Sequence, residues 1–140
     1  MLFCYYFVFQ TFPSKGTGTC HVSLHAEYGL LHVSNYAGGS FTSLRVDKSS
    51  GEILGEVYNE FFGDGSHVKP GRQEASHAHG AWTMGSFIYV ADLGADKIWH
   101  FQVLFSLLQS LLFKSCLAKV LDKSCNISQL DSCLLYFCLF

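Results

Sequence analysis

The chain has 140 residues, of which 49% are hydrophobic, and its formal net charge is −2. This length suits one modest domain, and the near-neutral charge excludes the strongly basic footprint of a nucleic-acid-binding protein. All 13 glycines lie between Gly16 and Gly94, and all 7 histidines lie between His21 and His100. Composition therefore divides the chain into an apolar N-terminal extension (1–15), a middle segment (16–103) and a tail rich in leucine and cysteine (104–140).

Neither end has the pattern of a targeting signal or a membrane span. Residues 1–12 are apolar but lack the basic start and small-residue cleavage site of a signal peptide. Polar residues interrupt the tail well before the roughly 18 apolar residues of a membrane helix. Cys20 is the single cysteine of the middle segment, which favours a reducing compartment over a disulfide framework. We therefore expect a cytoplasmic protein that does not span a membrane.

The middle segment consists of short strands separated by glycine-containing turns. Apolar and polar residues alternate over Cys20–His25, as in a strand with two unlike faces. Similar runs follow, with one longer loop over Gly63–Ser76. The further predicted strands are Leu30–Asn35, Ser40–Asp47, Glu52–Phe61, His77–Met84, Phe87–Asp92 and Lys97–Val103.

The second group of strands repeats the first. Val33–Val46 superposes on Val90–Val103 at an offset of 57, which places Asn35 on Asp92. Upstream, allowing a one-residue indel, His21 falls on His77. Repeats of four short strands are typical of β-propeller blades, although any antiparallel domain shares strands and glycine turns. The sequence predicts an all-β partial β-propeller of about two four-stranded antiparallel blades, too few to close a ring.

The tail does not continue the repeat. It has no glycine or histidine, and its first leucines recur at helical spacing, which favours a helix. They are Leu104, Leu107, Leu108, Leu111 and Leu112. We interpret residues 104–140 as a splice or gene-model end, with a similar join near residue 15. A genuine additional helix is the alternative.

The densest cluster of functional groups lies between Asp64 and His79. On a strand, His77 and His79 would share one face, about 6–7 Å apart along the strand. A histidine can remove a proton from water near neutral pH, and Arg72 could hold a carboxylate or phosphate. Alternatively, the histidines are structural, or they bind a metal together with Asp64 or Glu74. Without a CxxC or HExxH motif, we expect no metal and no other cofactor.

Three segments resemble the seven-bladed β-propeller lactonase family, and together they are much more specific than any one of them. The first is Leu31–Ser40, with the sequence LHVSNYAGGS. The second is Arg72–His79, with the sequence RQEASHAH, and the third is Tyr89–Ile98, with the sequence YVADLGADKI. The resemblance extends from Cys20 to Val103 and leaves both ends of the chain uncovered.

The resemblance implies hydrolysis of a phosphorylated sugar lactone in the pentose phosphate route, as in the 6-phosphogluconolactonases, without a cofactor. Its site would lie at the mouth of the propeller. It assigns catalytic roles to His77, His79 and Glu74, and substrate binding to Arg72, Asn35 and Asp92. Related members are lactonising cycloisomerases, and a propeller that lost catalysis would be a binding scaffold.

Because most blades of such a ring are absent, we expect this fragment to be inactive alone. We also expect it to be poorly soluble or only partly ordered, and to self-associate through unpaired blade edges.

Overall fold

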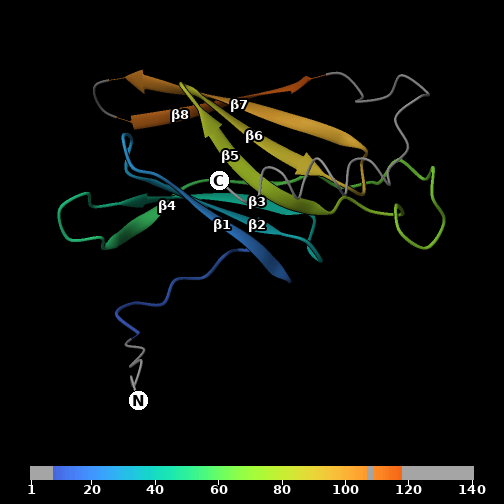
Figure 1. Ribbon diagram of the computed structural model, residues 1–140, viewed down its shortest axis with the longest axis horizontal. Helices are drawn as coiled ribbons and strands as arrows, with labels where there is room; N and C mark the ends of the chain where they lie inside the picture. Colours follow the sequence, from blue (N-terminus) through green and yellow to red (C-terminus); the bar gives the residue numbers. More distant parts are fainter. Residues whose placement is uncertain (1–7, 107–108, 118–140) are drawn as a thin grey trace, which may run out of the picture.

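The structure is a computed structural model, and it describes residues 8–106 and 109–117, with side chains up to Val103. Within these ranges the chain forms eight strands in two four-stranded antiparallel sheets (Figure 1). The first sheet has the order β1-β2-β3-β4 and the second β5-β6-β7-β8. No helix in the described part of the chain is long and apolar enough to cross a membrane.

Each sheet is a meander of consecutive strands, and we call the two sheets the first and the second blade. The strands of the first blade are β1 (Thr19–His25), β2 (Leu30–Asn35), β3 (Ser40–Val46) and β4 (Ile53–Phe61). Those of the second blade are β5 (Ala78–Met84), β6 (Phe87–Asp92), β7 (Lys97–Ser106) and β8 (Gln109–Leu117). The predicted all-β, two-blade architecture is confirmed, because alternation and glycine turns specify each hairpin locally.

The repeat is confirmed in the register of the strands. Asn35 ends β2 opposite Ser40, and Asp92 ends β6 opposite Lys97. The upstream superposition of His21 on His77 is wrong. The first strand of each blade has a bulge, at Cys20 in β1 and at His79 in β5. Because the two bulges occupy the same place in the register of their blades, Cys20 is the structural equivalent of His79. A bulge inserts one residue into a strand, and linear spacing does not show it.

The predicted helix at the start of the tail is also wrong. β7 continues to Ser106, and residues 109–117 form β8, which pairs along β7 from Ile98 to Ser106. Backbone N–H and C=O groups along the edge of β7 need partners, and a returning strand supplies them. The hairpin places Leu104 of β7 directly opposite Leu111 of β8, so these two leucines lie on two paired strands and not along one helix. Residues 118–140 lie outside the described residues.

The hydrophobic core lies between the two blades. Phe41 of β3 stacks on Phe101 of β7 with ring centroids 5.1 Å apart, and both side chains are fully buried. Phe62 stacks in the same way on Trp99, at 4.9 Å. Burying a large apolar side chain contributes about 1.5–3 kcal/mol, so these pairs hold the blades face to face.

The turns between strands divide between two ends of the molecule. One end carries the β2–β3 turn, the long β4–β5 loop and the β6–β7 turn, on the right-hand side of Figure 1. We call it the loop end. Backbone hydrogen bonds join its parts, from Ser66 N to Gly94 O at 2.8 Å and from Phe62 N to Gly39 O at 3.0 Å.

Candidate functional site

All six residues predicted for the site lie at the loop end, although they come from distant parts of the sequence. Asn35 and Asp92 end β2 and β6, and Arg72 and Glu74 lie in the β4–β5 loop. His77 immediately precedes β5, and His79 occupies its bulge. The repeat explains the grouping, because equivalent strand ends of packed blades point the same way.

His77 and His79 meet at Tyr36, the first residue of the β2–β3 turn. The ring of His77 stacks on Tyr36 at 4.5 Å and 9°, and the ring of His79 meets it edge-on at 5.8 Å and 85°. The sequence predicted that the two histidines share one face of a regular strand. In the structure, the rings of both histidines instead contact the ring of Tyr36, one stacked on it and one edge-on. Tyr36 was not predicted as a site residue, although it lies in the first family-like segment.

The geometry fixes which nitrogen of His77 carries the proton. Nδ1 lies 2.9 Å from the backbone oxygen of Tyr36. A carbonyl oxygen only accepts hydrogen bonds, so Nδ1 donates, and in a neutral imidazole Nε2 then keeps its lone pair. His77 is partly buried, and this hydrogen bond and the stacking on Tyr36 hold its ring in one orientation.

Asp92 is buried and serves as an anchor within the second blade. Its carboxylate accepts hydrogen bonds from His77 N at 2.8 Å, Ser76 Oγ at 2.5 Å, Ala95 N at 2.9 Å and Trp99 Nε1 at 3.0 Å. Four donors occupy most of its acceptor capacity. The structure thus places Asp92 behind His77, where it positions the backbone of that residue.

Asn35 has the corresponding anchoring position in the first blade. Its Nδ2 donates to Ser14 O at 3.1 Å and to Ser40 Oγ at 3.0 Å, and its Oδ1 accepts from Thr19 Oγ1 at 2.8 Å. The side chain is fully buried. The hydrogen bond to Ser40 joins the two ends of the β2–β3 turn, so Asn35 helps to position Tyr36 within that turn.

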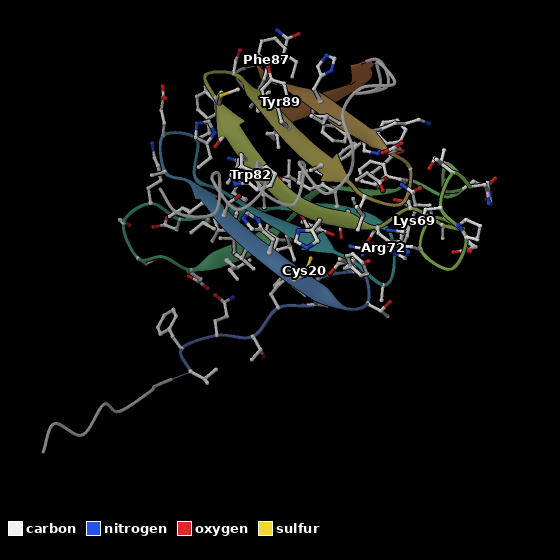
Figure 2. All side chains as sticks on the ribbon, turned by 45° about the vertical axis from the view of Figure 1, so that its right-hand side comes forward. Cys20, Lys69, Arg72, Trp82, Phe87 and Tyr89 are labelled. Carbon is white, nitrogen blue, oxygen red and sulfur yellow. The ribbon has the colours of Figure 1, made fainter. Side chains whose placement is uncertain are left out.

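Arg72 and Glu74 are exposed in the β4–β5 loop, with Lys69 on the same loop (Figure 2). The carboxylate of Glu74 accepts a hydrogen bond from the backbone N–H of Gly71. This bond is the main reason why the pKa of Glu74 lies below its ordinary value. Glu74 is thus an ionised carboxylate that closes a turn and leaves the two cations facing solvent.

Gln73 pins this loop, and sequence reasoning did not identify its role. Its buried side chain accepts a hydrogen bond from Lys69 N at 2.9 Å and donates to Leu93 O at 2.8 Å. These two hydrogen bonds tie the backbone of the loop around Lys69 to Leu93 in the β6–β7 turn. The sequence feature that could have indicated this role is the position of Gln73 between the charged residues Arg72 and Glu74 in the second family-like segment.

In the described part of the chain, no group of three histidine, cysteine, aspartate or glutamate side chains could hold a metal ion. The two histidines thus lack the third ligand, Asp64 or Glu74, that the metal alternative required. What the site offers is an oriented imidazole beside a cationic loop on an open surface.

Comparison with known proteins agrees with this architecture. A family model described as "Lactonase, 7-bladed beta-propeller" matches residues 8–110. The fold is similar to that of a periplasmic gluconolactonase of Pseudomonas aeruginosa, with a TM-score of 0.52 and 29% sequence identity. That match covers 59% of this chain but 23% of the gluconolactonase, so the chain spans about a quarter of that protein's length. No curated protein matches the chain.

Proposed function

Because the chain belongs to the lactonase family of seven-bladed β-propellers, we propose that it carries part of the catalytic site of a sugar-lactone hydrolase of the 6-phosphogluconolactonase type. The observation that supports this most directly is the His77 imidazole, which the Tyr36 carbonyl orients at the end of the β4–β5 loop that also carries Lys69 and Arg72. The gluconolactonase match supports a sugar lactone as the class of substrate.

In this proposal, His77 is the general base. Its Nε2 accepts a proton from water, and the resulting hydroxide attacks the lactone carbonyl carbon. The carbonyl oxygen becomes an oxyanion, which collapses as the ring C–O bond breaks, and the proton passes to the released hydroxyl group. His79, on the other side of Tyr36, is exposed and placed to donate a hydrogen bond to the substrate.

Arg72 and Lys69 would hold the anionic group of the substrate. A guanidinium binds a phosphate through two parallel hydrogen bonds, and an ammonium adds a point charge. Gln73 gives this loop a fixed place relative to Leu93. A phosphorylated sugar lactone therefore fits the loop better than a neutral one. A cytoplasmic setting is part of the proposal, and the free thiol of Cys20 supports it.

Two other functions fit the family. A lactonising cycloisomerase would use the same cations for a dicarboxylate, and a scaffold propeller would use the loop end only for binding. The oriented tautomer of His77 favours proton transfer over a pure scaffold, because a scaffold gains nothing from a free Nε2 lone pair.

The test is isothermal titration of the chain with 6-phosphogluconate, the product of the proposed reaction, and with gluconate. We expect tighter binding of 6-phosphogluconate, and we expect Arg72→Ala to weaken this binding by about tenfold or more, because the variant loses the charge-assisted hydrogen bonds of the guanidinium. Arg45→Ala, on β3 at the opposite end of the sheet, is the matched control and should bind like the unmodified chain. Equal binding of both ligands, or no effect of Arg72→Ala, would argue against the proposal.

A further inference from the structure

An open cavity of about 620 Å³ lies at the loop end, and none of the six residues predicted for the site lines it. Its described lining consists of residues 13–17, Gly38 in the β2–β3 turn and Phe61 at the end of β4. A backbone hydrogen bond joins the first of these walls to the turn, from Gly38 N to Thr17 O at 2.9 Å. The cavity is therefore formed by backbone segments that hold each other in place.

The segment before β1 uses its carbonyl oxygens within the protein and leaves its N–H groups unused. Ser14 O accepts hydrogen bonds from Asn35 Nδ2 at 3.1 Å and from Thr42 Oγ1 at 2.6 Å. In a trans peptide the next N–H points away from the carbonyl oxygen, so the N–H of Lys15 points away from these two donors. None of the N–H groups of residues 15–18 donates a hydrogen bond to the part of the chain that the structure describes.

Gly38 keeps the space in front of Thr17 open. A Cβ at position 38 would lie 2.9 Å from Thr17 N and 3.2 Å from Thr17 Oγ1. Thr17 is exposed, and neither its N–H nor its hydroxyl has a hydrogen-bond partner among the described residues. Because position 38 has no side chain, both of these donors are accessible from the cavity.

Lys15 adds a positive charge beside these donors. Its side chain is exposed and forms no ion pair with any described residue. Its φ of 59° lies in the left-handed region, and turns with such residues can gather N–H groups into a concavity that binds anions. Phe61, which also lines the cavity, is 59% exposed. The described lining thus provides a cation, uncharged donors and an aromatic ring, but no carboxylate.

We propose that this cavity binds a small phosphate monoester, with the phosphate at Lys15 and Thr17 and the organic group against Phe61. A phosphate monoester carries about −1.5 to −2 charge near pH 7 and three strong acceptor oxygens, which match an ammonium, an N–H and an O–H. The organic group explains the use of an exposed aromatic ring in the wall. The proposal does not depend on lactone chemistry, because the residues proposed for catalysis do not line the cavity.

The experiment is a titration of the full ¹⁵N-labelled chain with phenyl phosphate and with inorganic phosphate, followed through the backbone amide resonances of Thr17 and Gly38. We expect both resonances to move in a saturable way. Phenyl phosphate should bind about fivefold more tightly, because its ring covers apolar surface of Phe61. Phe61→Ser should remove this preference, and the ring is exposed enough for the change to leave the fold intact.

Lys15→Gln should weaken the binding of both ligands by about tenfold, because it removes the charge that assists the hydrogen bonds to phosphate. Lys48→Gln is the matched control, since Lys48 is also exposed but lies in the β3–β4 turn, away from the loop end. Arg72→Ala separates this site from the one proposed for the lactone substrate. Both of these variants should reproduce the titration curves of the unmodified chain.

Resonances of Thr17 and Gly38 that neither ligand moves would overturn the proposal. Equal affinities for the two ligands in the unmodified chain would also overturn it, because the aromatic wall is part of the proposed site. The same holds if Lys15→Gln binds like Lys48→Gln. A loss of the Thr17 and Gly38 shifts in Arg72→Ala would contradict the proposal as well, by assigning the phosphate to the β4–β5 loop.

Discussion

The carboxylate of Asp92 accepts a hydrogen bond from the backbone N–H of His77 at 2.8 Å. The imidazole of His77 donates its Nδ1 proton to the backbone oxygen of Tyr36 in the first blade. His77 is therefore held by both blades, its backbone by the second and its ring by the first. The orientation of the proposed base depends on how the blades pack, and stability and site geometry can be perturbed together.

Asp92→Ala should destabilise the chain strongly, by about 3 kcal/mol or more, because it leaves the N–H groups of His77, Ala95 and Trp99 without their acceptor. Urea unfolding followed by circular dichroism measures the loss. Asp47→Ala is the matched control, since Asp47 also accepts four hydrogen bonds, from Ser49 and Ser50 at a surface turn. Solvent replaces those bonds, so a cost as large as that of Asp92→Ala would contradict the assignment of Asp92 as a buried anchor.

Gly39→Ala should cost clearly more stability than Gly51→Ala. Both glycines have positive φ, 57° and 79°, so each substitution carries a backbone penalty of about 1 kcal/mol. A Cβ at Gly39 would lie 2.5 Å from the backbone oxygen of Ser76, whereas nothing lies within 4 Å at Gly51. The excess for Gly39→Ala in thermal unfolding reports how closely the β2–β3 turn approaches the residue before His77. Equal losses of stability in the two variants would mean that the β2–β3 turn and the backbone of Ser76 lie further apart than in this structure.

His32 should make the chain lose stability as the pH falls below about 6. Burial lowers the pKa of His32 from 6.5 to about 3, and neither ring nitrogen has a hydrogen-bond partner among the described residues. The unfolded chain then binds a proton below pH 6.5 that the folded chain excludes. The contribution of His32 to the free energy of unfolding is therefore fully present above pH 6.5. Below it, this contribution declines by at most about 1.4 kcal/mol per pH unit towards pH 3.

Urea unfolding at several pH values measures this slope, and His32→Leu is the variant that isolates it. Leucine removes the titrating group and keeps an apolar side chain beside Phe41, which lies 5.6 Å from the imidazole. We expect a shallower acid slope in the variant than in the unmodified chain. Identical slopes would mean that His32 is accessible to protons in the folded state.

Much of the fold could be predicted because the signals are local. Alternation marks a strand, and glycine turns such as the one containing Gly39 mark its ends. The offset that relates Asn35 to Asp92 is visible because β2 and β6 are both 6 residues long and the turns that follow them, 36–39 and 93–96, are equal in length. The bulges at Cys20 and His79 were not predictable, because a bulge depends on the partner strand.

The sequence indicated which polar residues gather at the loop end, but not what each of them contacts. The polar segment Arg72–His79 and the repeat indicated the gathering. The main acceptor for His77 is a backbone oxygen, that of Tyr36, and a backbone oxygen has no sequence signature. The family resemblance assigned substrate binding to Asn35 and Asp92, which stand at corresponding strand ends of the repeat. The structure uses both as internal anchors, and this depended on burial that only tertiary packing determines.

The most direct test of the central claim is a long-range ¹H–¹⁵N correlation spectrum of the His77 imidazole during titration with 6-phosphogluconate. The account predicts a proton on Nδ1 in the free chain, and an Nε2 resonance that moves in a saturable way as the ligand binds. A proton on Nε2 in the free chain, or a His77 spectrum that the ligand leaves unchanged, would contradict it.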